Sequence, residues 1–215
     1  MSRDLVILIE HLESDLGKWI LAEYRNAYRI AGDRLLITGV EVPGIPSTRR
    51  SFHEIADLNK TVILDPSADE VLTPRDLDVY KYIVIGGILG SHPPMGRTRK
   101  LLSDRFPMVA KRNIGEHQFS IDGSVYMVME ISKGREISEI PIAVGLRIRM
   151  LVTIYSEHEI YLPYAYPLVK GKPVISEELL KYLTGGAGYS FEFDRIIGPV
   201  EKSRRGPRSR RRKAI

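Results

Sequence analysis

Apolar and polar positions alternate in blocks along the first 145 or so residues. Short apolar runs bounded by turn residues are typical of strands that are buried on both faces of a parallel sheet. Such runs predict strands at 5–10, 34–40, 61–66, 82–87 and 108–115. Because amphipathic segments separate these runs, the pattern predicts an α/β fold, in which helices cover both faces of a mostly parallel sheet.

The helices between the strands are indicated by helical spacing and by residues suited to helix ends. After the first strand, Ser14 or Asp15 can cap a helix that runs to about Ile30. Trp19 falls at helical spacing within it and is interpreted as a core residue. Further helices are predicted at 73–80, capped by Thr73 and begun by Pro74, at 97–106, and at 123–134, capped by Ser120 or Asp122.

The pattern of apolar and polar residues changes after Pro141. Apolar and polar residues there alternate one by one, as they do in antiparallel or edge strands. A helix capped by Ser176 is predicted at 176–183. We therefore expect one domain over 1–200, in which 145–200 adds strands and a helix, followed by a basic, disordered tail at 201–215.

Composition narrows the class of protein. The chain has no cysteine, which excludes disulfides, thiolate zinc sites and a cysteine nucleophile. No window of about 18 apolar residues occurs, so no membrane partner is expected. Acids inside and just after the first apolar run are unlike a signal peptide, and a cytoplasmic location is expected.

The positive charge is concentrated in the tail. The net charge is +5, yet the stretch 202–213 contains eight basic residues and no acid, and without it 24 basic and 27 acidic residues remain. A basic tail is drawn to polyanions, so contact with RNA through 202–213 is predicted. The alternative is a solvated, solubilising terminus.

A glycine-rich segment follows the fourth predicted strand: "YIVIGGILGSHPPMGRT" covers 82–98. Its spacing fails both the P-loop pattern and the dinucleotide-binding glycine pattern. Ligands of open α/β sheets bind beyond the carboxyl ends of the strands, where this segment lies. Two interpretations of the segment remain open: a loop that brings its backbone close to a nucleoside, and a tight turn.

Two other segments carry candidate chemistry. "EHLES" ends the first strand with Glu10, His11 and Glu13, which could bind a cationic acceptor or take a proton, or could simply favour a helix N-terminus. "RNIGEHQFSIDGSVYMVMEISKG" (112–134) leaves a strand through a polar loop into a capped apolar helix, as either the second wall of a nucleotide pocket or an ordinary strand-to-helix link would. The histidines are scattered without metal-binding spacing, so no metal site is predicted.

Together the segments "GGILG...PP...RT", "RNIG..Q.S.D..V" and "IEHLESDLGKWILAEY" resemble the SPOUT class of S-adenosylmethionine-dependent methyltransferases. Within that class they are similar to the archaeal and eukaryotic branch long labelled a predicted RNA methyltransferase, whose yeast member methylates an arginine of a ribosomal protein. The resemblance covers roughly residues 5–145.

The resemblance implies a deep trefoil knot and S-adenosylmethionine bound bent within it. It implies a first wall of the pocket at Gly86, Gly87, Ile88, Leu89 and Gly90. It implies a second wall at Ile114, Gly115, Gln118 and Ser120, with Val125 as an apolar neighbour, and a third wall near 137–140.

The resemblance also suggests roles at the acceptor. A guanidinium acceptor is cationic, so carboxylates must bind and orient it, and Glu10 and Glu13 are the candidates, with His11 as orienter or proton relay. Arg97 and Arg99 could hold an acidic or phosphate part of the partner. For an RNA base the same acids could serve as general base, and Asp122 is a further candidate.

The function expected from the resemblance is therefore a methyltransferase of the translation machinery. Its acceptor is either an arginine of a ribosomal protein or a nucleotide of rRNA or tRNA. The alternative is a non-catalytic RNA- or ribosome-binding protein that retains the fold. A monomer and a homodimer formed through the knot both remain open.

Overall fold

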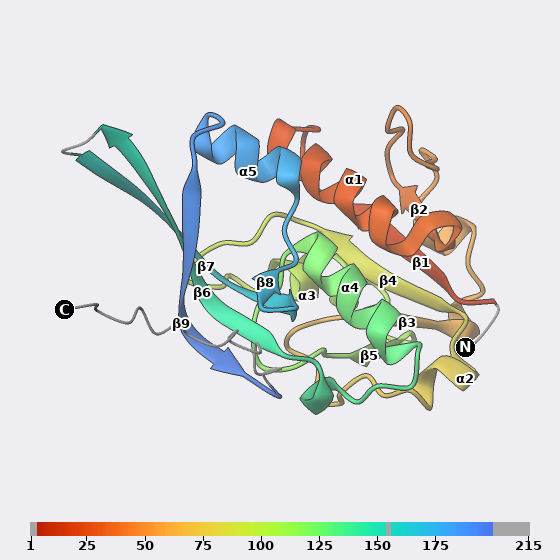
Figure 1. The fold of residues 1–215 in the computed structure, drawn as a ribbon. Coiled ribbons are helices and arrows are strands. Elements are labelled where there is room, and N and C mark those ends of the chain that lie inside the picture. Colours follow the sequence, from red (N-terminus) through yellow and green to blue (C-terminus); the bar gives the residue numbers. More distant parts are fainter. Residues whose placement is uncertain (1–3, 154–155, 200–215) are drawn as a thin grey trace, which may run out of the picture.

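The structure, a computed structural model, describes residues 4–153 and 156–199 and contains two β-sheets (Figure 1). The predicted basic tail at 201–215 lies outside the described residues. Among the helices of the described ranges, none is both long enough and apolar enough to cross a membrane.

The first sheet is parallel throughout and has the strand order β2-β1-β4-β3-β5. Its central strands are buried on both faces, as unbroken apolar runs require. All the predicted strands are present, although the second, third and fifth are shorter than predicted. Their bounds are β1 Val6–His11, β2 Leu35–Thr38, β3 Thr61–Leu64, β4 Tyr82–Gly87 and β5 Ala110–Arg112.

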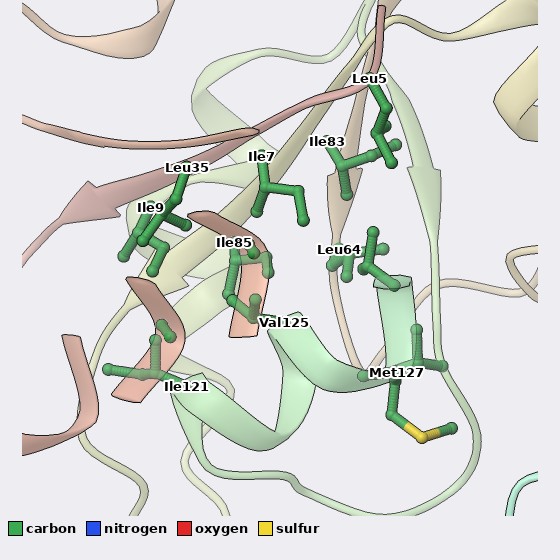
Figure 2. Close-up of a cluster of buried hydrophobic side chains, with 14 of the residues drawn as sticks. Leu5, Ile7, Ile9, Leu35, Leu64, Ile83, Ile85, Ile121, Val125 and Met127 are labelled. Atoms are coloured by element: carbon green, nitrogen blue, oxygen red, sulfur yellow. The ribbon is translucent and has the colours of Figure 1, made fainter. Parts of the chain in front are cut away.

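Two helices, α1 (Lys18–Ala31) and α4 (Ile121–Ile131), lie side by side on one face of this sheet (Figure 1). Val125 and Met127 of α4 are fully buried in the main hydrophobic cluster, beside Ile7, Ile83 and Ile85 of the central strands (Figure 2). Burial of this apolar surface is the main source of the fold's stability.

The predicted N-terminal cap of α1 is wrong. The helix begins at Lys18 after Gly17, and neither Ser14 nor Asp15 caps it. The chain after β1 first runs along the glycine-rich loop, where the N–H of Leu12 donates to the carbonyl of Gly87. These residues therefore belong to the sheet edge rather than to the helix. In α4, by contrast, the hydroxyl of Ser120 accepts a hydrogen bond from the N–H of Gly123, as predicted.

The opposite face of the sheet packs against short helical segments through Phe52, Leu102 and Phe106. The predicted helix 97–106 is in fact α3 (Arg97–Leu101) followed by a 3-10 turn, η4 (Ser103–Arg105). The predicted helix 73–80 is shortened to α2 (Asp76–Val79), whose Leu77 packs in the main cluster on the α1 and α4 side, and the hydroxyl of Thr73 donates to the carboxylate of Asp76 at its start. The other 3-10 turns are η1 Gly32–Arg34, η2 Phe52–Glu54, η3 Leu58–Lys60 and η5 Ile137–Glu139.

The second sheet is antiparallel, as the alternating pattern after Pro141 predicts, and has the order β8-β7-β6-β9. Its long strands β6 and β7 extend away from the first sheet (Figure 1). Helix α5 (Glu177–Thr184) is capped by Ser176 as predicted and packs near α1. The strands are β6 Ile142–Thr153, β7 Ser156–Val169, β8 Lys172–Pro173 and β9 Tyr189–Ile197.

The strand register brings two of the predicted segments together. At the carboxyl edge of the first sheet, Glu10 pairs with Gly86 and His11 pairs with Gly87 across β1 and β4. The segment 10–14 and the glycine-rich loop therefore lie side by side at the edge where ligands of such sheets bind.

Candidate active site

Three adjoining cavities lie at this edge, and they share several lining residues. The edge cavity, of about 70 Å³, lies over the ends of β3, β4 and β5 and is lined by Leu64, Asp65, Pro66, Ile85, Gly86, Ile88, Thr98, Asn113, Ile114, Gly115, His117, Gln118, Phe119, Ile121 and Ser124. The aromatic cavity, of about 160 Å³, is lined by Trp19, Glu23, Ile88, Leu89, Gly90, Phe119, Ser120, Ile121 and Tyr164. The rim cavity, of about 270 Å³, is lined by residues of 65–67, 88–98 and 116–118.

The two predicted walls do meet around the edge cavity. Gly86 and Ile88 come from the first wall, and Ile114, Gly115 and Gln118 come from the second. Asp65 and Pro66, which end the third predicted strand at the same edge, also line this cavity, although they were not among the predicted site residues. The prediction also missed Thr98 and Phe119, for which no local signal exists.

The glycines of the first wall serve different purposes. A Cβ at Gly86 would project toward Ile88 and Thr98, at 3.4 Å and 3.7 Å from their side chains, and both residues line the edge cavity. A Cβ at Gly87 would instead lie 2.2 Å from the hydroxyl oxygen of Tyr24, inside the protein. Gly86 therefore keeps the cavity open, whereas Gly87 is required for internal packing.

Gly115 of the second wall is required for its backbone conformation. Its φ is +110°, which residues with side chains rarely adopt. Its N–H donates to the side-chain oxygen of Asn113, at 3.0 Å, which fixes the turn after β5. A Cβ at Gly115 would lie 4.0 Å from the side chain of Ile137, so the predicted third wall lies next to the second.

The other predicted cofactor residues are distributed differently. Leu89, Gly90 and Ser120 line the aromatic cavity. Val125 is fully buried in the hydrophobic cluster beneath the site. Gly90 is tightly enclosed, since a Cβ there would lie 2.5 Å from the ring of Tyr164 and 2.6 Å from the side-chain nitrogen of Gln118.

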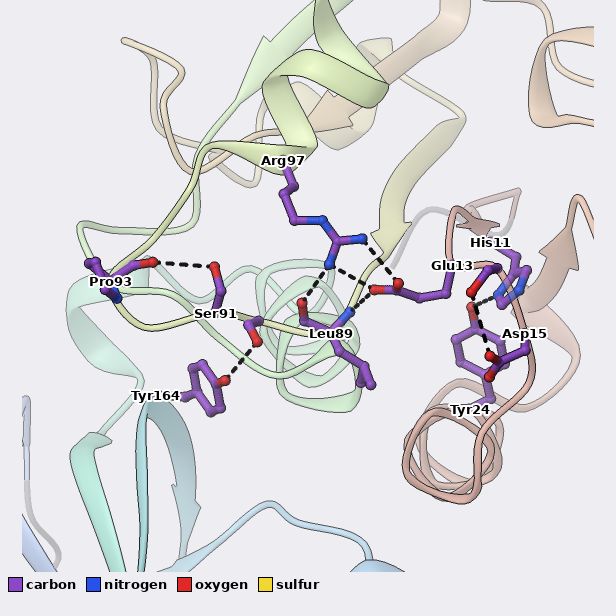
Figure 3. A network of polar contacts seen from close by, with 11 residues as sticks. His11, Glu13, Asp15, Tyr24, Leu89, Ser91, Pro93, Arg97 and Tyr164 are labelled. Carbon is purple, nitrogen blue, oxygen red and sulfur yellow. Dashed lines mark hydrogen bonds and ion pairs between the residues drawn. The ribbon is translucent and has the colours of Figure 1, made fainter.

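Glu13 and Arg97 form a two-bonded ion pair across the glycine-rich loop (Figure 3). The Nη1–Oε1 and Nη2–Oε2 distances are both 3.0 Å, and the N–H of Leu89 donates to the same carboxylate at 2.9 Å. The hydrogen bond from Arg97 lowers the pKa of Glu13 below its ordinary value. Glu13 is therefore ionised at neutral pH and holds the loop in place.

His11 lies against α1. Its Nδ1 is 2.9 Å from the hydroxyl of Tyr24 (Figure 3). Burial lowers the pKa of His11 from its ordinary value, against the opposing effect of the nearby acids. The imidazole is thus largely neutral at neutral pH and can accept or donate one proton.

Glu10 faces away from the three cavities. Its carboxylate is buried and accepts hydrogen bonds from the hydroxyls of Thr38 and Ser51, at 2.5 Å and 2.6 Å, and from the N–H of Phe52, at 2.9 Å. These bonds join β1 to β2 and to the turn η2. The structure thus separates Glu10 from Glu13, although the sequence places them three residues apart.

The two predicted substrate-binding arginines face different grooves. Arg97 lines the rim cavity. Arg99 is exposed, lies 3.6 Å from Asp104, and lines a shallow groove beside β5. The predicted alternative base, Asp122, is fully buried and hydrogen bonded to Asn26 and Ser120 rather than open to a cavity.

Glu23 of α1 is a further ionisable side chain that the sequence did not single out. It is only 5% exposed and lines the aromatic cavity. The indole N–H of Trp19 donates to one oxygen at 2.7 Å, and the N–H of Ile121 donates to the other at 2.9 Å. Burial, and secondarily the charge of Asp122, raises the pKa of Glu23 to about 8.

Comparisons with known proteins give a consistent result. Residues 6–190 match the family model described as "Protein arginine N-methyltransferase SFM1-like". The curated protein arginine N-methyltransferase SFM1 of Saccharomyces cerevisiae is 26% identical over 211 residues, which cover 86% of this chain and 97% of that protein.

Solved structures are similar as well. The crystal structure of yeast SFM1 complexed with S-adenosylmethionine has a TM-score of 0.72 at 26% identity, covering 84% of this chain and 90% of that chain. A Trm10 structure from Thermococcus kodakaraensis, at 19% identity and a TM-score of 0.50, covers 62% of this chain and 95% of that one and shows likeness of fold alone.

Proposed function

The chain belongs to the family of SFM1-like protein arginine N-methyltransferases, and on this basis we propose that it transfers a methyl group from S-adenosylmethionine to an arginine side chain of a protein. The family match carries the proposal, because it spans both glycine-containing walls and the segment from Glu10 to Glu13. The resemblance to SPOUT-class methyltransferases noted in the sequence is thereby confirmed.

The residues of the edge cavity fit the cofactor. Gly86 leaves open the space that a side chain would fill, and Ile88, Ile114 and Phe119 offer apolar walls for an adenine ring. Pockets for ligands of this size are usually about 300 Å³ or larger, so the cofactor would extend from the edge cavity into the rim cavity, which shares Asp65, Ile88 and Thr98 with it. When bound, S-adenosylmethionine supplies a methyl group that is already activated by its positive sulfur.

The chain's own residues then have to position the acceptor rather than activate the methyl group. The ion pair of Glu13 and Arg97 holds Leu89 of the first wall through both its N–H and its carbonyl. His11 lies beside Gly87 of this loop and is held by its hydrogen bond with the hydroxyl of Tyr24. We propose that these residues shape the cofactor pocket, and that Glu10 joins β1 to β2 beneath it.

The finer features of the fold are part of the proposal. We propose that 1–200 forms one domain and that the glycine-rich loop and the segment 113–120, which both border the edge cavity, form the trefoil knot of SPOUT enzymes. The cytoplasm is the proposed location. The acceptor arginine is proposed to belong to a ribosomal protein, with the basic tail at 202–213 drawing the enzyme to the RNA around it.

The experiment that tests the function uses the full chain with tritiated S-adenosylmethionine and ribosomes from cells that lack the enzyme. Label that survives RNase but not protease, and that appears as methylarginine after hydrolysis, supports the proposal. Label removed by RNase would mean an RNA acceptor instead. Absence of S-adenosylmethionine binding by calorimetry at millimolar concentration would contradict any methyltransferase function and favour a non-catalytic binding protein.

The tail has a separate test. Removal of 202–215 is expected to weaken association with ribosomes at low salt and to reduce its salt dependence, because fewer phosphate counterions are released. Sedimentation with ribosomes at several salt concentrations measures this. Unchanged association would mean that the tail only aids solubility.

A further inference from the structure

The aromatic cavity has the composition of a site for a flat cation. Three aromatic side chains line it, from Trp19 of α1, from Phe119 before α4 and from Tyr164 of β7. Aromatic faces attract cations, and a planar guanidinium can also stack on them. The cavity measures about 160 Å³, well above the roughly 10–15 Å³ that one water molecule needs.

A buried carboxylate forms part of the same wall. Each oxygen of Glu23 accepts one hydrogen bond, from Trp19 and from Ile121, and a carboxylate has about four acceptor positions in all. Both oxygens thus retain capacity for the paired N–H groups of a guanidinium. Asp122 lies close enough to raise the pKa of Glu23 further.

This acidic pair has no cationic partner within the described ranges. None of the salt bridges formed by residues 4–153 and 156–199 involves Glu23 or Asp122. The two carboxyl groups are instead bonded to the neutral groups of Trp19, Asn26 and Ser120 and to backbone N–H groups. Without a cation this pair keeps Glu23 largely protonated at neutral pH, and an incoming cation would favour release of that proton to solvent and pairing with the ionised carboxylate.

The cavity also lies where an acceptor has to lie. It shares Ile88, Phe119 and Ile121 with the edge cavity, so a group inside it is directly beside the proposed cofactor. The hydroxyl of Tyr164 donates to the carbonyl of Gly90 at 2.9 Å, which closes the wall between the second sheet and the glycine-rich loop (Figure 3).

The acids favoured by the sequence are less suited to this role. The three hydrogen bonds to Glu10 come from inside the protein. Glu13 already binds a guanidinium of its own chain, that of Arg97. Glu23, by contrast, is buried, faces the aromatic cavity and has no such partner among the described residues.

We propose that the aromatic cavity binds the guanidinium of the substrate arginine, and that Glu23 is the carboxylate that receives it. This inference rests on the proposed methyltransferase function. The aromatic side chains enclose the guanidinium plane, and Glu23 binds two of its N–H groups and so fixes which nitrogen faces the edge cavity.

The test uses the single tryptophan of the chain, Trp19, as a reporter inside the cavity. The full-length protein, saturated with S-adenosylhomocysteine, is titrated with N-acetyl-arginine methylamide while tryptophan fluorescence is recorded. N-acetyl-citrulline methylamide, which has the same shape but no charge, is the matched control ligand. The arginine probe is expected to change the fluorescence saturably, and the citrulline probe is not. Equal responses to both probes, or no response to either, would overturn the proposal.

The Glu23→Gln variant is expected to bind the arginine probe at least about tenfold more weakly, as the loss of a buried charged hydrogen-bond partner implies. Its affinity for S-adenosylmethionine, measured by calorimetry, should stay within about twofold of the wild-type value, since Glu23 lines the cavity beside the cofactor. Equal weakening of cofactor binding would mean that the cavity serves the cofactor and would overturn the proposal.

Two further variants separate the proposal from misfolding and from an acceptor site at Glu13. Tyr164→Leu leaves the buried acids intact and is expected to weaken binding of the arginine probe more than binding of the cofactor. Glu13→Gln tests the acid favoured by the sequence, and a loss of probe binding there, with none in Glu23→Gln, would refute the assignment. If the wild-type protein binds cofactor and methylates a protein arginine while the cavity variants bind the probe normally, this inference fails and the proposed function stands.

Discussion

Arg97 donates two hydrogen bonds of 3.0 Å to Glu13 and one to the carbonyl of Leu89, so that one side chain joins the end of β1 to the glycine-rich loop. The two partners are 84 residues apart in sequence. Their side chains are 31% and 21% exposed, so the pair is screened in part and should add at most about 1 kcal/mol to folding stability. The main effect of the pair should therefore be on the position of the glycine-rich loop.

We therefore expect Arg97→Ala to weaken S-adenosylmethionine binding about tenfold while lowering the free energy of unfolding by no more than about 1 kcal/mol. Calorimetry with the cofactor and urea denaturation measure the two effects. The exposed Arg99→Ala, on the same helix, is the control and should change neither. Equal cofactor affinity in Arg97→Ala and wild type would show that the loop keeps its shape without the pair.

The same pair predicts a pH effect. Because the pKa of Glu13 is lowered in the folded protein, its contribution to stability is present above the ordinary value of 4.5 and is lost as pH falls through the folded value. NMR titration of the Glu13 carboxyl should give a pKa below 4.5 in the wild type and a higher value in Arg97→Ala. An unchanged pKa in the variant would contradict the role assigned to Arg97.

Two neighbouring glycines should respond differently to the same change. Gly86→Ala places a methyl group near Ile88 and Thr98 without severe overlap, so the protein should fold and bind S-adenosylmethionine more weakly. Gly87→Ala places its methyl group 2.2 Å from the hydroxyl of Tyr24 and 2.9 Å from the carbonyl of Glu10, so it should be destabilised by about 1–3 kcal/mol. Thermal unfolding and cofactor calorimetry on both variants separate the effects. A well-folded Gly87→Ala that fails to bind cofactor would reverse the assignment.

Glu10 should behave as a structural residue. Glu10→Gln cannot accept all the hydrogen bonds that come from Thr38, Ser51 and Phe52, and a buried unsatisfied donor costs about 1–3 kcal/mol. Urea unfolding should show this loss, whereas exposed Asp15→Asn should leave stability within about 0.5 kcal/mol. A stable Glu10→Gln variant with greatly reduced turnover would instead support a catalytic role.

The sequence was sufficient for the parallel sheet because each strand carries its own signal. Apolar runs such as 5–10 and 82–87 are buried on both faces, and the capping residues Ser120 and Ser176 act within their own helices. The start of α1 was misplaced because the residues after β1 bond to Gly87 and Leu89, which are far away in sequence.

The aromatic cavity could not be predicted in the same way. Trp19 has the spacing of a core residue and does contact the apolar cluster of the second sheet, yet it also lines the cavity. Glu23 is one acid in a helix, and its bond to Ile121 spans 98 residues. Tyr164 meets Gly90 only because the antiparallel sheet packs beside the glycine-rich loop. These contacts depend on tertiary packing, for which short motifs carry no signal.

The raised pKa of Glu23 makes a final prediction about stability. Because the pKa rises from 4.5 to about 8 on folding, the folded protein favours the protonated carboxyl, whose stabilising contribution is complete below pH 4.5 and is lost as pH rises through about 8. Glu23→Gln carries no charge, so its stability relative to wild type should rise between pH 5 and pH 8, by up to about 1.4 kcal/mol per pH unit. Asp122, whose pKa is also raised by burial, contributes to this pH dependence. The tyrosines around the pair stay neutral throughout this range because their pKa values are raised; they are Tyr24, Tyr164 and Tyr166. Urea unfolding at several pH values measures the difference, and Glu178→Gln, an exposed acid on α5, is the control that should show no such trend. A stability difference that stays constant with pH would mean that Glu23 is already ionised in the folded protein, with a cation supplied from elsewhere.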